Sequence, residues 1–197
     1  AFAAEAAATG AISSAEANRI FAAEAGTLDR SAAASSPGGQ IRTANVAADR
    51  DDRIAALKAL WGRGKADSPE RYGWQVASAF AAARVAPDGA LSADAPAIAQ
   101  SLVSAGITAT AGRWWRATED ARSADRAGLW AALVAVSRDV PVEGGLFDSW
   151  ASDVPAHRAA LLAAGLEGLG RGKVGRDTPA LDNDWTRAMD AAVAARR

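Results

Sequence analysis

The sequence predicts an all-α protein, arranged as a stack of about four antiparallel helical hairpins in the manner of an α-solenoid. Three observations support this prediction. The chain is rich in alanine, its apolar residues recur at helical spacing between clear start and stop signals, and its tryptophans recur at nearly regular intervals. An irregular compact helical bundle is the alternative architecture.

The composition favours helices over strands. Alanine makes up roughly a quarter of the 197 residues, and aromatic residues make up only 6%. Alanine has the highest intrinsic helix propensity and loses almost no side-chain entropy on folding, whereas sheets are typically packed by β-branched and aromatic residues. Helices that approach one another closely are therefore expected.

Residues 1–50 differ from the rest, and we expect them to form an N-terminal helix followed by a Ser/Ala/Gly linker. Ser13 and Glu16 have the spacing of a capping box, which predicts a helix beginning there. Residues 31–40 read SAAASSPGGQ, a small and polar stretch broken by proline and glycine. This stretch is predicted to be a linker or a mobile loop.

Residues 51–197 are expected to form the helical-hairpin repeat domain. Its first helix runs from Arg53 to Trp61, with apolar residues on one stripe and glycines after its end. Ser68 and Pro69 then supply an N-cap and a proline at the first helical position of a second helix. So short a turn predicts that the two helices are antiparallel.

The same signals predict three more hairpins along the chain. Their first helices begin at Asp94, Asp125 and Arg158, and their second helices or partner regions carry Trp114 with Trp115, then Trp150, then Trp185. Each first helix is followed by glycine, proline or polar residues that end it. The chain therefore contains enough signals for four hairpins, counting the one that begins at Arg53.

Two internal similarities indicate that the hairpins are repeats. The second helices carry Trp74, Trp114, Trp150 and Trp185, which are separated by 40, 36 and 35 residues. Gly-Arg-Gly-Lys occurs at 62–65 and again at 170–173, after the first helix of the first and last hairpins. The period is similar to that of tetratricopeptide-type solenoids, although the similarity covers only the period and the hairpin form, and not that family's signature residues.

Composition also excludes several classes of function. With 22 Lys and Arg against 23 Asp and Glu, the net charge is −1, so nucleic acid is not an expected partner. Without cysteine and with His157 as the single histidine, no thiolate or multi-histidine metal site is possible, and no cofactor is expected. The longest strongly apolar stretch, 129–136, is far shorter than the roughly 20 residues that a membrane-spanning helix needs.

The origin of the chain is indicated only weakly. Its arginine- and alanine-rich composition favours a bacterial source, and a first residue other than methionine slightly favours an exported or periplasmic protein. The oligomeric state is not determined by the sequence.

The best candidate for a contact surface is the segment Arg113, Trp114, Trp115, Arg116, together with Glu119. Aromatic faces beside guanidinium groups form stacking platforms for sugars and single-stranded nucleic acids. Adjacent residues on a helix point about 100° apart, so one indole can be buried while the other is partly exposed. Packing of both indoles in the core, with the arginines reaching solvent, is the favoured alternative.

The remaining motifs are interpreted as helix ends rather than as catalytic sites. In 170–173 the residue pattern lacks the first glycine and the hydroxyl residue of a phosphate-binding loop, and the segment follows a helix C-terminus, which repels anions. Three acidic pairs, Asp51 with Asp52, Glu119 with Asp120, and Asp182 with Asp184, all flank predicted helices. His157 has no serine nucleophile in a suitable motif, so no catalytic residue is predicted and an enzyme is disfavoured.

Three functions are compatible with these residues. The first is a helical-repeat module for protein–protein interaction or scaffolding, which binds a protein or peptide on its concave face. The second is a helical domain that binds or acts on cell-wall or other glycans, with Trp114 or Trp115 in a cleft facing Glu119 or Asp120. The third is a structural or assembly subunit, which would leave an apolar face uncovered.

Overall fold

The computed structural model describes residues 2–65 and 68–174, and every regular element in this part of the chain is a helix. The prediction of an all-α protein is therefore confirmed for the described residues. In chain order the elements are α1 (Phe2–Ala8), α2 (Ser14–Thr27), α3 (Arg30–Ser35), α4 (Pro37–Val46), α5 (Arg50–Trp61), α6 (Pro69–Ala82), the 3-10 helix η1 (Gly89–Leu91), α7 (Ala95–Ser104), α8 (Thr108–Ala117), α9 (Ser123–Leu133), α10 (Gly144–Ala151) and α11 (Ala156–Gly168).

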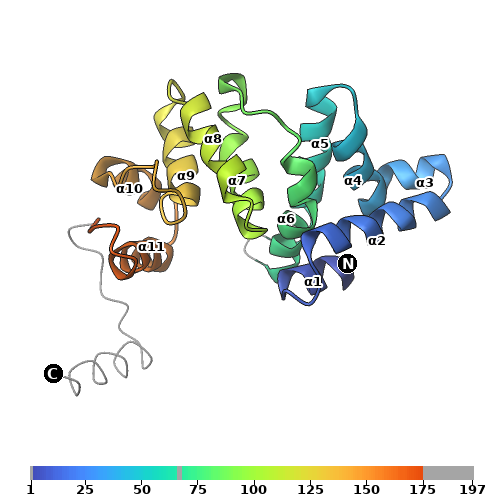
Figure 1. The fold of residues 1–197 in the computed structure, drawn as a ribbon, viewed down its shortest axis with the longest axis horizontal. Helices are drawn as coiled ribbons and strands as arrows, with labels where there is room; N and C mark the ends of the chain where they lie inside the picture. Colours follow the sequence, from blue (N-terminus) through green and yellow to red (C-terminus); the bar gives the residue numbers. More distant parts are fainter. Residues whose placement is uncertain (1, 66–67, 175–197) are drawn as a thin grey trace, which may run out of the picture.

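The helices form an arched row (Figure 1). The helices α1 to α6 lie at one end of the row, α7 and α8 in the middle, and α9 to α11 at the other end. Consecutive helices pack in pairs, α5 on α6, α7 on α8 and α9 on α10, and α7 also packs on α6 and α9. None of the described helices is long and apolar enough to cross a membrane.

Several helices begin at the residues that the sequence indicated. Ser13 and Ser68 each accept a hydrogen bond from the backbone N–H three residues later, at 3.1 and 3.2 Å, and so cap α2 and α6. The helix α9 begins slightly earlier than predicted. Asp125, the predicted cap, lies in its first turn and pairs with Arg122 at 3.0 Å.

The prediction of a linker at 31–40 is wrong, because this stretch lies almost entirely in α3 and α4. Ser36 caps α4 by accepting from a backbone N–H at 2.9 Å. The glycines serve close packing: a Cβ on Gly38 would overlap the backbone oxygen of Phe21 and lie 3.1 Å from the Cβ of Ala25. Small residues therefore let α4 approach α2, and they were misread as a sign of flexibility.

The predicted boundary at residue 50 coincides with the start of α5, but helices on both sides of it pack together. The helix α6 contacts α1, α2 and α4 from the N-terminal side as well as α5 and α7. Gly73 permits the closest of these contacts, since a Cβ there would lie 2.7 Å from the carbonyl carbon of Ala4 in α1. The helix α6 is consequently enclosed over most of its length.

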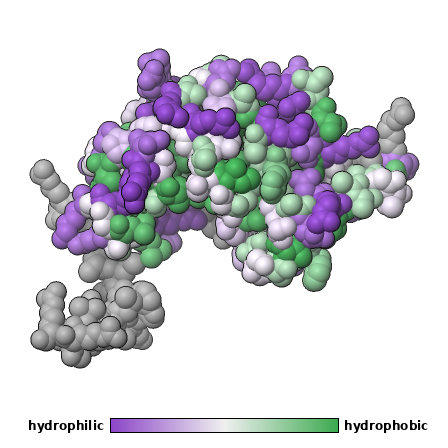
Figure 2. Space-filling view, in the orientation of Figure 1, coloured by the Kyte–Doolittle hydropathy of each residue, from purple (hydrophilic) through white to green (hydrophobic). Residues whose placement is uncertain are grey.

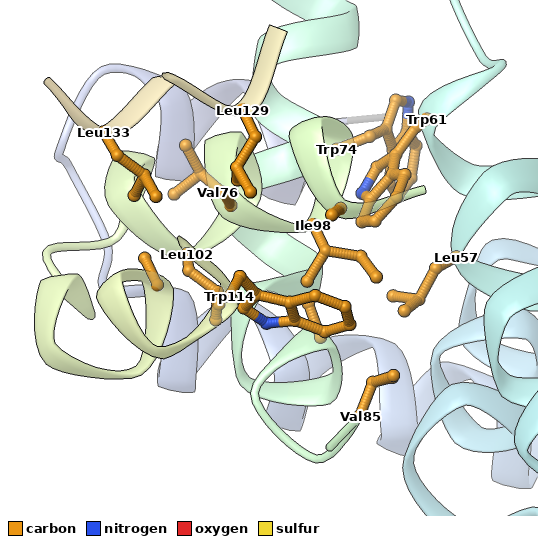
Figure 3. Close-up of a cluster of buried hydrophobic side chains, with 14 of the residues drawn as sticks. Leu57, Trp61, Trp74, Val76, Val85, Ile98, Leu102, Trp114, Leu129 and Leu133 are labelled. Carbon is orange, nitrogen blue, oxygen red and sulfur yellow. The ribbon is translucent and has the colours of Figure 1, made fainter. Parts of the chain in front are cut away.

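The described helices share one buried core that contains large aromatic side chains. Trp74, Trp114 and Trp130 are among its largest fully buried residues, and Figure 3 shows the first two among aliphatic side chains of neighbouring helices. Trp150 is only partly buried and packs against Phe147, with ring centroids 6.4 Å apart. Trp185 and the second helix of the predicted fourth hairpin lie outside the described residues.

The two Gly-Arg-Gly-Lys segments end helices, as their capping interpretation predicted. Gly64 and Gly170 have φ angles of 76° and 67°, the left-handed conformation that glycine adopts most easily after a helix. At the end of α11, the N–H of Arg171 donates to the carbonyl of Leu166 at 2.8 Å. Lys173 forms an ion pair with Glu167 at 2.9 Å, near the negative end of the same helix.

Candidate functional site

The predicted contact segment on α8 is divided between core and surface. Trp114 has no exposed area and Trp115 is 7% exposed, whereas Arg113, Arg116 and Glu119 are exposed. Neither indole therefore offers a free face for stacking on a sugar ring. The geometry expected for a glycan cleft at these tryptophans is not present, and the alternative of core packing with solvent-exposed arginines describes these residues.

The cation that covers Trp115 comes from another helix. The guanidinium carbon of Arg126 in α9 lies 3.2 Å from the centroid of the Trp115 ring, and its Nη1 donates to the Trp115 carbonyl and, at 3.4 Å, to Oγ1 of Thr118. Burial lowers the pKa of Arg126, while the carboxylates of Glu143 and Glu119 act in the opposite direction. Sequence analysis did not single out Arg126, because only the packing of α8 on α9 brings it to Trp115.

The acidic pairs and the histidine do not converge on a catalytic site. Asp51 and Asp52 lie in the first turn of α5, where their negative charges interact favourably with the positive end of the helix dipole. His157 is exposed at the start of α11. Among the described residues no three His, Asp or Glu side chains are grouped so that they could hold a metal ion. Asp182 and Asp184 lie outside the described residues.

A groove of about 680 Å³ lies where the end of α5, the first half of α6 and the first half of α7 meet. Its volume is in the range of small-molecule and peptide-segment sites. The side chains that line it are mostly polar or aromatic, and they come from four helices and the segments that precede α6 and α7: Lys58, Trp61, Ser68, Arg71, Tyr72, Gln75, Asp94, Gln100 and Arg158.

Hydrogen bonds connect α6 to α7, and α5 to α6, beside the groove. Nε2 of Gln75 donates to Oε1 of Gln100 at 3.1 Å, and the hydroxyl of Ser101 donates to the carbonyl of Gln75 at 2.7 Å. The indole N–H of Trp61 donates to Oγ of Ser78 at 2.9 Å. These bonds are buried or partly buried, so the polar groups at the groove are held in fixed positions.

The charged side chains of the groove differ in their partners. Lys58 forms an ion pair with Asp94 at 2.8 Å, which neutralises the carboxylate that precedes α7. Arg158, at the start of α11, also has a hydrogen-bonding or electrostatic partner. Arg71 is partly buried in the first turn of α6 and has no side-chain hydrogen bond or ion pair among the described residues. Among the described cations of the groove, Arg71 is therefore the one whose side chain has no hydrogen-bond or ion-pair partner.

Sequence analysis did not identify this groove, although part of the signal was present. Arg71 and Gln75 are four residues apart, so they lie on the same face of α6, beside the stripe that carries Trp74. Gln100 lies on α7, and nothing in the order of residues indicates that it meets Gln75. Only the tertiary packing of α6 on α7 brings these side chains together.

Comparisons of this chain with models of known protein families, with curated proteins and with solved structures found no match.

Proposed function

We propose that this chain is a helical-repeat interaction module that binds a peptide segment of a partner protein in the groove between α5, α6 and α7. The observation that carries the proposal is that consecutive helices contribute fixed polar side chains to one open groove. A stack of hairpins forms such extended surfaces because each helix adds one row of side chains to the same face.

The packing of the helices supports the repeat part of the proposal. The pairs α5–α6, α7–α8 and α9–α10 are each packed within themselves, and α7 packs on the helices before and after its own pair. Trp74 and Trp114, on the second helices of the first two pairs, are both fully enclosed in the common core. Such packing is what a hairpin-repeat protein would need, because a single hairpin cannot bury both of its faces alone.

The chemistry of the groove suits a peptide better than an apolar ligand. A peptide backbone presents N–H and C=O groups that need partners when they leave water. Gln75 and Gln100 provide amide donors and acceptors to the groove, while Tyr72, 43% exposed, provides an aromatic face and a hydroxyl. Tyrosine and arginine are both enriched at protein–protein interfaces, and this groove contains Tyr72 and Arg71.

The test is a selection from a random dodecapeptide display library, followed by synthesis of the enriched peptides and mapping of their binding by backbone amide NMR shifts. We expect the largest shifts at residues of α6 and α7 that line the groove, and weaker binding to the variant Gln100→Ala. Arg113→Ala, on the exposed face of α8, is the matched control and should bind normally. Shifts confined to other helices, or no enriched peptide, would contradict the proposal.

A second candidate function, that of an assembly subunit, is favoured by the uncovered apolar face at α1 and α2. Phe2 is 84% exposed and Ile20 is 43% exposed, and with Ile12 and Phe21 they line an apolar depression of about 290 Å³. Hydrophobic residues are visible over α1 at the lower edge of Figure 2. A patch of this kind can bind a second copy of the chain.

Sedimentation over a range of protein concentrations tests the second candidate. Self-association through this face predicts a mass that rises with concentration, and the double variant Phe2→Ser, Ile20→Ser should remove the rise. A constant monomeric mass, or a rise that the double variant leaves unchanged, would eliminate this role for α1 and α2.

A further inference from the structure

We infer that the groove recognises a carboxylate of its peptide and that Arg71 is the residue that binds it. The inference rests on the proposed peptide-binding function and specifies the chemistry of the ligand. It starts from the difference between Arg71 and the other arginines at similar depth.

Arginines that are partly buried in the described residues otherwise have partners. Arg53, Arg63, Arg126 and Arg171 each donate side-chain hydrogen bonds to oxygen atoms, and Arg158 has an interaction. Arg71 is partly buried without one. A partly buried guanidinium that makes no hydrogen bond or ion pair with the described residues keeps its N–H donors for an external anion.

The groove that contains Arg71 also supplies a side-chain donor, and its described carboxylate is paired. The Oε1 atom of Gln100 is occupied by Gln75, which leaves the Nε2 group of Gln100 as a donor at the groove. Asp94, the acidic side chain among the described groove residues, is paired with Lys58. Arg71 also lies near the N-terminus of the 14-residue helix α6, where the helix dipole favours a negative charge.

A carboxylate fits this set of groups. Its two oxygen atoms can accept two parallel hydrogen bonds from one guanidinium, and a side-chain amide can supply a further bond. In a peptide the carboxylate comes either from an Asp or Glu side chain or from the C-terminus. Both sources present the same group to Arg71, and the experiment separates them.

The test uses four dodecapeptide pools that are degenerate in all residues except Asp and Glu, with Glu or Gln fixed at the centre and with a free or an amidated C-terminus. Binding is measured by competition at low salt, and its location by amide NMR shifts. We expect pools that contain a carboxylate to bind about ten- to a hundredfold more tightly than the Gln pool with an amidated end, as one charged hydrogen-bonded pair allows. The preference between the Glu pool with an amidated end and the Gln pool with a free end identifies the source.

The variants Arg71→Gln and Arg71→Lys show whether Arg71 causes the preference. Arg71→Gln should remove it, and Arg71→Lys should retain part of it because the charge remains without the fork of donors. Arg116→Gln, an exposed arginine on α8, is the control and should leave the preference intact. Since the side chain of Arg71 has no hydrogen-bond or ion-pair partner among residues 2–65 and 68–174, Arg71→Gln should not lower the melting temperature, which separates a binding role from a structural one.

The outcomes distinguish the two proposals. If all four pools shift groove residues equally, or if Arg71→Gln leaves the preference unchanged, the carboxylate inference is overturned while the peptide-binding function stands. If no pool shifts the groove residues, both are overturned.

Discussion

The helices α5 and α11 show how one local sequence behaves in two settings. Each is followed by Gly-Arg-Gly-Lys, each of these segments contains a glycine with positive φ, Gly64 or Gly170, and each contains an arginine that bonds to a neighbouring segment. The helix α5 lies between α4 and α6, whereas the main packing contact of α11 in the described residues is with α10. On α11, Leu161 is 57% exposed, while on α5 Leu57 is fully buried.

The two arginines repeat the same kind of bond with different partners. Arg63 donates to Oε1 of Gln40 at 3.1 Å and to the carbonyl of Ser35 at 3.1 Å, and its guanidinium carbon is 5.7 Å from the centroid of Trp74. Arg171 donates to the carbonyls of Ser137 and Val140 at 2.9 and 2.7 Å. The shared Gly-Arg-Gly-Lys segment thus places glycines and an arginine after both helices, whereas the neighbouring helices determine how much of each helix is buried.

The largest expected difference between the two helices comes from matched leucine truncations. Leu57→Ala leaves a cavity in the core and should lower the free energy of unfolding by about 2–5 kcal/mol. Leu161→Ala removes a largely exposed side chain and should change it by less than about 0.5 kcal/mol. Urea unfolding followed by circular dichroism measures both, and equal losses would show that α11 is as enclosed as α5.

Matched glycine substitutions in the enclosed and peripheral helices should have opposite signs. Gly73→Ala would place a Cβ against the backbone of Ala4, so we expect α1 to be displaced and stability to fall by about 1–3 kcal/mol. Gly165 in α11 has no atom within 4 Å of the added Cβ, so Gly165→Ala should raise stability by about 0.5–1 kcal/mol. Thermal unfolding compares them, and a stabilising Gly73→Ala would show that α1 does not pack on α6 as described.

The arginines after α5 and α11 should contribute similarly to the free energy of unfolding if the Gly-Arg-Gly-Lys segment has the same role in both places. We expect Arg63→Gln and Arg171→Gln each to lower the free energy of unfolding by about 1–2 kcal/mol, through the loss of hydrogen bonds to partly buried oxygen atoms. Urea unfolding measures both variants. A loss at Arg63 alone would mean that the similarity of the two segments ends at the helix cap.

The smallest expected effect is on the N-terminal cap of α3, a short helix that buries few side chains. The backbone N–H of Ala32 and the Ser31 side chain donate to Asp29, and these bonds hold the pKa of Asp29 below its usual 3.8. Because folding lowers this pKa, the bonds to the ionised carboxylate stabilise the cap fully at pH values above the pKa of Asp29 in the unfolded chain. Their contribution is lost as the pH falls through the pKa of the folded state. The amide shifts of Ser31 and Ala32 should therefore titrate with a midpoint below 3.8. A midpoint at or above that value would contradict the cap.

Much of the fold could be predicted because its signals are local. Ser13 and Ser68 cap the helices that they were expected to cap, and glycines lie at the ends of α5 and α11, where Gly62 is the C-cap and Gly170 follows the C-cap. The stretch at 31–40 could not be predicted, because Gly38 is small for a contact with α2 that is distant in the chain. The candidate site failed for the same reason: Trp115 is covered by Arg126 of the next helix.

By itself, the sequence determined the helical class, most of the helix starts and ends, and the recurrence of tryptophan at one place in each predicted hairpin, since these depend on interactions within a few residues. Only the tertiary structure decided which tryptophans are enclosed, that α6 is covered by the N-terminal helices, and that Arg71 and Gln100 line one groove. The burial of a side chain, and the positions of side chains from different helices around one groove, depend on which helix faces pack together. The order of residues along the chain does not indicate which faces these are.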